Sequence, residues 1–145
     1  MKLKKLQWIC KPEIVKITSS SSLTCEPCGE TALVYTFAED EKCSVWIRAE
    51  EGISYGLALI LSEEHGASLM AENGMLVRRI SFLGMRDETI IPLHDRESFS
   101  FSKEGDRLIF LNGDETVSSF QLASIRQSVS VGIIMRGKGR VSLSF

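Results

Sequence analysis

Apolar and polar residues alternate along most of the chain. Segments such as ALVYTFA, SVWIRA, MLVRRISFL and RVSLSF place apolar side chains at every second position and are rich in Val, Ile, Phe and Ser. A period of two is typical of half-buried β-strands. Turn-forming residues separate these segments at short intervals: Glu39-Asp40-Glu41, Glu51-Gly52, Glu72-Asn73-Gly74, Gly105-Asp106, Asn112-Gly113-Asp114 and Gly137-Lys138-Gly139.

The pattern predicts an all-β protein in which a single domain covers residues 1–145. About a dozen short strands do not fit comfortably into one open sheet, so we expect a jelly-roll sandwich of two antiparallel sheets. Only FQLASIRQ, residues 120–127, has room for a short helical turn. Asn112-Gly113 predicts a type I′ hairpin turn. The last strand, residues 140–145, is expected to pair near the first, residues 4–10.

Composition and net charge limit the classes of function and partner that the chain can have. A chain of 145 residues buries about 70% of its unfolded surface, so it needs neither metal nor disulfide to fold. The net charge of −2 offers no electrostatic surface for nucleic acid or anionic membrane. The charged start lacks the apolar region of a signal peptide. These features predict a cytoplasmic protein with reduced thiols, no cofactor, and no nucleic-acid or membrane partner.

Four cysteines allow two chemical interpretations. Cys25 and Cys28 form a C-x-x-C pair, but no helix follows to lower a thiol pKa, which argues against a redox centre. Together with Cys10 and Cys43 they supply the four thiols that a structural zinc site requires. However, zinc ribbons carry two C-x-x-C knuckles, and here there is one. We therefore favour a loop shaped by Pro27 and Gly29, with Cys10 and Cys43 packed in strands as small hydrophobic residues.

Over nearly its full length the chain resembles the concanavalin A-like lectin/glucanase superfamily, and in particular its small bacterial members, whose function is not established. The resemblance rests on the order and spacing of LQWICKPE, IVKITSSSS, SVWIRAEEGISYGLALILS, DRLIFLNGDETVSSFQLA, VSVGIIM and RVSLSF. It implies a jelly roll of two curved sheets. The chain departs from the pattern at CEPCGETALVYTF and SEEHGASL, where such relatives usually carry tryptophans of the kind that can stack on sugars. Their absence weakens the case for carbohydrate binding.

The resemblance also bears on catalysis. Retaining glucanases of the superfamily carry Glu, Asp and Glu on one face of a concave strand. The acidic clusters here, Glu39-Asp40-Glu41, Glu50-Glu51 and Glu63-Glu64-His65, have the composition of solvated turns. His94, beside Asp95, likewise fits a surface turn. An enzyme is therefore the least favoured reading.

A binding face is the best remaining candidate. In SVWIRAE, alternation places Trp46, Arg48 and Glu50 on one face of a strand, where an aromatic ring and a guanidinium can bind a sugar or an anion. Tyr55 follows the next turn, and Arg79 in MLVRRISFL adds a second guanidinium. The alternative is that Trp46 belongs to the core, as tryptophans usually do.

Together these observations predict a non-catalytic module that binds a glycan or another small polar ligand on a concave sheet face. The alternative is a structural or protein-interaction module that self-associates into a homo-oligomer. A glycan-active enzyme comes third.

Overall fold

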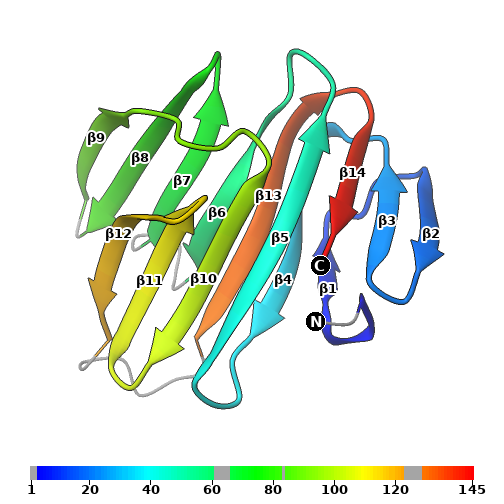
Figure 1. Ribbon diagram of the computed structural model, residues 1–145. Coiled ribbons are helices and arrows are strands. Elements are labelled where there is room, and N and C mark those ends of the chain that lie inside the picture. The colour runs from blue at the N-terminus through cyan, green and yellow to red at the C-terminus, as the bar shows by residue number, and fades with distance from the viewer. Residues whose placement is uncertain (1–2, 61–65, 83, 123–128) are drawn as a thin grey trace.

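The computed structural model describes residues 3–60, 66–82, 84–122 and 129–145. Two antiparallel sheets of seven strands each pack face to face, which confirms the predicted all-β sandwich (Figure 1). A short 3₁₀ turn, η1 (Leu3–Lys5), precedes the first strand, and no α-helix occurs among the described residues. Of the segment expected to hold a helical turn, Phe120 and Gln121 belong to a strand and residues 123–128 lie outside the described part.

Sheet A has the strand order β1-β4-β13-β6-β7-β8-β9. Its strands are β1 (Gln7–Ile9), β4 (Cys28–Thr36), β6 (Ser54–Ile60), β7 (Gly66–Glu72), β8 (Met75–Phe82), β9 (Met85–Ile91) and β13 (Ser130–Lys138). Sheet B, in front in Figure 1, has the order β12-β11-β10-β5-β14-β3-β2. Its strands are β2 (Val15–Ser19), β3 (Ser22–Cys25), β5 (Glu41–Ala49), β10 (Ser98–Glu104), β11 (Arg107–Asn112), β12 (Glu115–Gln121) and β14 (Val141–Ser144).

The core is the layer of alternate side chains between the two sheets. Both sheets contribute fully buried side chains to this layer. Those of sheet B include Val45, Ile47, Phe99, Phe101 and Phe110, and those of sheet A include Leu57, Leu69, Leu76, Val131, Ile133 and Met135. Aromatic rings cross this layer in edge-to-face contacts, with Phe37 and Phe101 centroids 5.7 Å apart and Tyr55 and Phe99 centroids 6.0 Å apart. Each strand therefore directs one face to the core and the other to the outside of the sandwich.

The predicted hairpin at Asn112-Gly113 is confirmed, because β11 and β12 pair antiparallel with Asn112 opposite Glu115. Its type I′ geometry and the pairing of the terminal strands are not. Asn112 has no positive φ, and only Gly113 (φ 60°) takes the left-handed conformation in that turn. The Asn-Gly pair with both φ angles positive is Asn73 (52°) and Gly74 (77°), between β7 and β8. The terminal strands also do not pair, because β14 lies between β5 and β3 while β1 forms the edge of the other sheet.

Both ends of the described chain are instead tied to the serine turn between β2 and β3. The amide of Leu3 donates to the carbonyl of Ser20, and the amide of Phe145 donates to the carbonyl of Ser21. These two hydrogen bonds hold the terminal residues against the sandwich without a shared strand.

Glycine is required where two strands of sheet A approach each other most closely. A Cβ at Gly56 on β6 would overlap the carbonyl oxygen of Leu69 on β7. On the same outer face, Ala58, Met70 and Val77 are also buried. The centre of the outer face of sheet A therefore holds glycine, alanine and other buried side chains.

We predict that Gly56→Ala destabilises the fold by about 3 kcal/mol or more, because backbone has to move to admit the methyl group. The measurement is urea unfolding followed by circular dichroism. Gly132→Ala is the matched control. It lies on the same outer face, and its new methyl would meet mainly the flexible end of Ile60 at 3.1 Å. Equal stability losses for the two variants would contradict the close approach at Gly56.

Candidate functional site

Trp46 stands at the centre of the outer face of sheet B. Its strand, β5, is the fourth of seven, and Val45 and Ile47 on either side point into the core with no exposed surface. Strand alternation therefore directs Trp46 outward, where it is 48% exposed. The open-face interpretation of this tryptophan is the one that the structure supports, and the core alternative is wrong.

Hydroxyl groups surround this indole. Ser98 on β10 and Ser144 on β14 are its direct cross-strand neighbours. The same face carries further serines and threonines at alternate positions of its strands: Ser22, Thr24, Ser44, Ser100, Ser102 and Ser142. Ser44 and Ser100 share a hydrogen bond of 3.0 Å. The result is an aromatic ring on a sheet surface rich in groups that both donate and accept hydrogen bonds.

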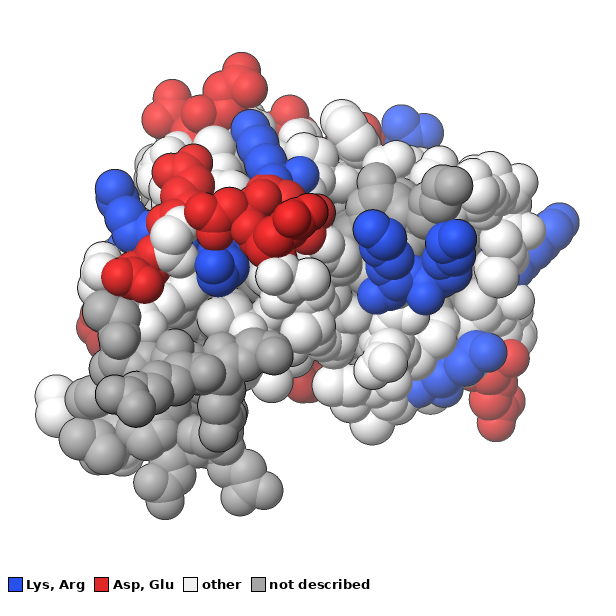
Figure 2. Space-filling model, turned by 90° about the horizontal axis from the view of Figure 1, so that it is seen from below, with Lys and Arg blue, Asp and Glu red and all other residues white. Residues whose placement is uncertain are grey.

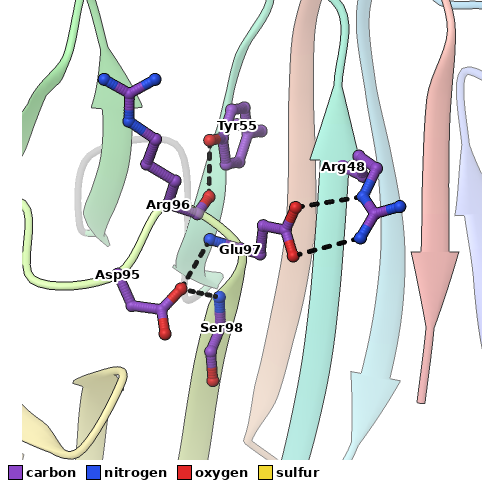
Figure 3. Close-up of polar contacts among 6 residues, drawn as sticks. All are labelled: Arg48, Tyr55, Asp95, Arg96, Glu97 and Ser98. Atoms are coloured by element: carbon purple, nitrogen blue, oxygen red, sulfur yellow. Dashed lines mark hydrogen bonds and ion pairs between the residues drawn. The ribbon is translucent and has the colours of Figure 1, made fainter.

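Arg48 extends the site along β5. Its Nε donates to Oε1 of Glu97 at 3.0 Å, and its Nη2 donates to Oε2 at 3.5 Å (Figure 3). The Arg48 side chain remains 78% exposed, so the pair is a solvated fork that contributes little to stability. It joins the central strand to the segment between β9 and β10.

Two buried or capping side chains hold that segment in place. Asp95 accepts hydrogen bonds from the amides of Glu97 and Ser98 at 2.9 and 3.0 Å (Figure 3). Asn112, which has no exposed surface, accepts from the amides of His94 and Asp95 and donates to the carbonyls of Asp95 and Ser98. Asn112 thus fixes the position of Glu97. Sequence reasoning missed this role, because the Asn-Gly pair suggests only a turn.

Glu50 and Tyr55 lie at the end of the sandwich, not on the Trp46 face. Glu50 follows the last residue of β5, and Tyr55 lies on β6 in the opposite sheet, half-buried against Phe99. The Tyr55 hydroxyl donates to the carbonyl of Arg96 at 2.6 Å (Figure 3), and burial raises the pKa of that hydroxyl. Both residues line a cavity of about 730 Å³ at this end.

Arg79 does not join the other predicted site residues. It lies on the outer face of sheet A, where its guanidinium pairs with Glu72 at 2.6 Å and with Glu88 at 3.0 Å. The five predicted residues are therefore split between the outer face of sheet B, the end cavity and the opposite sheet.

The four cysteines are also separated. Cys25 and Cys43 are buried, whereas Cys10 and Cys28 are exposed. The Cys25 thiol points between the sheets and donates to Sδ of Met135 at 3.8 Å. Burial raises the pKa of both Cys25 and Cys43 to about 11. Cys43 packs in its strand as expected, but the same expectation for Cys10 is wrong, because Cys10 lies at a bend after β1.

No group of three or more His, Cys, Asp or Glu side chains in the described part of the chain is placed to hold a metal ion.

Figure 2 shows acidic side chains gathered at the end opposite the cavity, over the β4–β5 and β10–β11 turns. There Asp40 accepts from Nζ of Lys103 and from the amide of Gly105, both at 2.9 Å. These two bonds hold the pKa of the Asp40 carboxyl below its usual range. Glu39 and Asp40 lie in a turn as predicted, whereas Glu41 begins β5. Glu63-Glu64-His65 lies outside the described residues.

Within the described residues, no helix has the length and apolar character to span a lipid bilayer.

Comparison with solved structures defines the fold. The chain is similar to the PSpry domain of TRIM65 (10% identity, 97% of this chain and 90% of that chain, TM-score 0.62). It is also similar to the Bacillus licheniformis β-glucanase (10% identity, 96% and 88%, TM-score 0.59). A third similar structure is the receptor-binding domain of botulinum neurotoxin D (10% identity, 96% of this chain and 43% of that chain, TM-score 0.53).

These neighbours share a concanavalin-like jelly roll, so the class of fold indicated by the sequence is confirmed. No protein-family model and no curated protein sequence matches the chain. At this level of identity the similarity concerns the fold alone, and the function has to be argued from the surface.

We predict that native protein reacts with iodoacetamide at Cys10 and Cys28 and stays unmodified at Cys25 and Cys43, because the latter thiols are buried and protonated at neutral pH. Mass spectrometry of tryptic peptides before and after unfolding measures this difference. Modification of Cys25 in native protein at the rate of Cys28 would show that the thiol does not point between the sheets.

Proposed function

We propose that this protein is a non-catalytic module that binds a glycan on the outer face of sheet B. The observation that carries the proposal is Trp46, half-exposed at the centre of a seven-stranded sheet with serines on the neighbouring strands. Indole rings stack on the apolar faces of sugar rings, and serine hydroxyls can both donate to and accept from sugar hydroxyls.

The state of Arg48 favours a neutral sugar. Two of its N–H groups are already engaged by Glu97, so the pair presents donors and acceptors with no net charge. A sugar carboxylate would have to displace Glu97, whereas a sugar hydroxyl can bind beside it. The hydroxyl-rich strands around Trp46 are consistent with the same ligand.

A second candidate function is self-association, and it would use a different surface from glycan binding. The observation that favours self-association is a set of exposed apolar side chains on the outer face of sheet A: Ile9, Ile60, Met75 and Ile90. This second candidate does not use Trp46, so the two functions can be separated by experiment.

We predict that Trp46→Ala weakens binding of a glycan identified on an array by about tenfold or more, because a stacked ring contributes about 0.5–1.5 kcal/mol in addition to its buried area. Arg48→Ala weakens it by less. Both variants should melt within a few degrees of the original protein, because both side chains project from the sheet. Isothermal titration calorimetry and thermal melts measure the two effects.

Ile90→Ala is the matched control, since Ile90 is 61% exposed on the other sheet and its loss should leave glycan affinity unchanged. Unchanged affinity in Trp46→Ala would refute the site. Release of reducing ends from the bound glycan would refute the non-catalytic assignment. A chain that binds no glycan and sediments as a dimer of the 16.2 kDa protein would favour self-association.

A further inference from the structure

The cavity at the end of the sandwich is separate from the Trp46 face. Residues of three segments line its walls: the β5–β6 turn, the β7–β8 turn, and the connection between β9 and β10. These segments lie together at the upper end of the molecule in Figure 1. Its volume of about 730 Å³ falls within the range of small-molecule sites in proteins.

The cavity has apolar walls where it meets the core. Ile53 and Ala71 are buried, and the Tyr55 ring and Leu93 are partly buried against the same core cluster. The Tyr55 hydroxyl is already engaged by the Arg96 carbonyl, so the ring presents mainly its carbon surface. A ligand with an apolar body can cover this surface and exclude water from it.

Charges of both signs stand at the entrance. Glu50 and Glu51 lie on the β5–β6 turn, and Arg96 lies on the β9–β10 connection. All three are exposed, and no ion pair between described residues includes any of them. Figure 3 shows the Arg96 guanidinium directed away from the Arg48–Glu97 pair, so that pair does not neutralise it.

Two turns and one hydrogen bond shape the backbone around the cavity. Gly52 has a φ of 91°, and a Cβ at Gly137 would lie 3.0 Å from the Gly52 carbonyl oxygen. On the opposite side Asn73 and Gly74 form the tight turn with two positive φ angles. The Tyr55–Arg96 hydrogen bond ties the third segment to β6. These features hold the three segments in place, and a site held in place loses less conformational entropy on binding.

We propose that this cavity binds a small zwitterion with an apolar body, the chemical class of hydrophobic amino acids and dipeptides. The ammonium group lies toward Glu50 and Glu51, the carboxylate lies toward Arg96, and the side chains cover Ile53, Tyr55 and Leu93. A ligand with a single charge would be attracted by one side of the entrance and repelled by the other. A neutral sugar would use neither charge.

The test uses ¹⁵N-labelled full-length protein and the dipeptide leucyl-phenylalanine, followed by NMR and calorimetry. Saturable shifts are expected at the amides of Ser54, Ala71 and Asn73. The acetylated dipeptide lacks the ammonium group and the dipeptide amide lacks the carboxylate, so each should bind about tenfold more weakly. Glycyl-glycine keeps both charges without the apolar body and should not saturate the site.

Substitutions then test which protein side chain recognises each charged end of the dipeptide. Arg96→Gln should abolish the preference for the free dipeptide over its amide, and the double variant Glu50→Gln/Glu51→Gln should abolish the preference over the acetylated form. Arg86→Gln and Glu104→Gln, both exposed and outside the cavity, are the matched controls and should keep both preferences. The ¹⁵N spectrum of each variant reports whether it folds.

Absence of saturable shifts at the three amides would overturn the proposal. Equal affinity for the free and capped dipeptides, or preferences that survive in the Arg96 and Glu50/Glu51 variants, would do the same. Because no glycan takes part, these outcomes leave the Trp46 site unaffected, and failure of the Trp46 site leaves the cavity unaffected.

Discussion

The buried layer between the two sheets is the interaction on which the rest of the structure depends. Side chains of β5 and β10 in sheet B meet those of β6 and β13 in sheet A, and Phe99, Phe101 and Ile133 have no exposed surface. Because successive residues of a strand point to opposite sides, burying one set commits the other set to solvent. A one-residue slip of β5 would move Trp46 into the core and Val45 and Ile47 out of it. The packing of the core therefore decides which side chains lie on the outer faces of the sheets.

The same constraint explains why the two outer faces differ. The strands of sheet A approach closely at Gly56, and its outer face has buried small residues at the centre, with exposed isoleucine and methionine side chains and the Arg79 ion pairs around them. Sheet B has serines at the outward positions of its strands and one indole at its centre. The end of the sandwich differs again, because there the core opens between turns that carry charge. One fold thus presents three chemically distinct surfaces.

Much of the fold could be predicted from alternation alone, because a period of two reports directly on which residues share a face. This is why Trp46 and Arg48 were placed correctly beside each other. What alternation does not report is which strands become neighbours, since that depends on contacts between segments distant in sequence. Arg79 was grouped with Trp46 although it lies on the other sheet, and β14 was expected beside β1 although it inserts between β3 and β5.

The role of Asn112 was missed for a similar reason. Its partners, His94, Asp95 and Ser98, precede it by 14 to 18 residues, and a buried amide that satisfies backbone groups leaves no periodic signal. The serines of SFSFS and RVSLSF did carry a signal, since they alternate with core residues. Only the register of β5 with β10 and β14 shows that these serines surround one tryptophan.

The most direct measurement of the central claim uses the fluorescence of Trp46 itself. The chain has two tryptophans, and Trp8 is partly buried against the core, so Trp8→Phe leaves Trp46 as the single indole reporter. Titration with neutral gluco-, xylo-, manno- and chito-oligosaccharides should begin from the emission of a solvent-exposed indole and give a saturable blue shift with at least one of them. Emission already typical of a buried indole, or emission unchanged by every oligosaccharide that calorimetry shows to bind, would contradict the account.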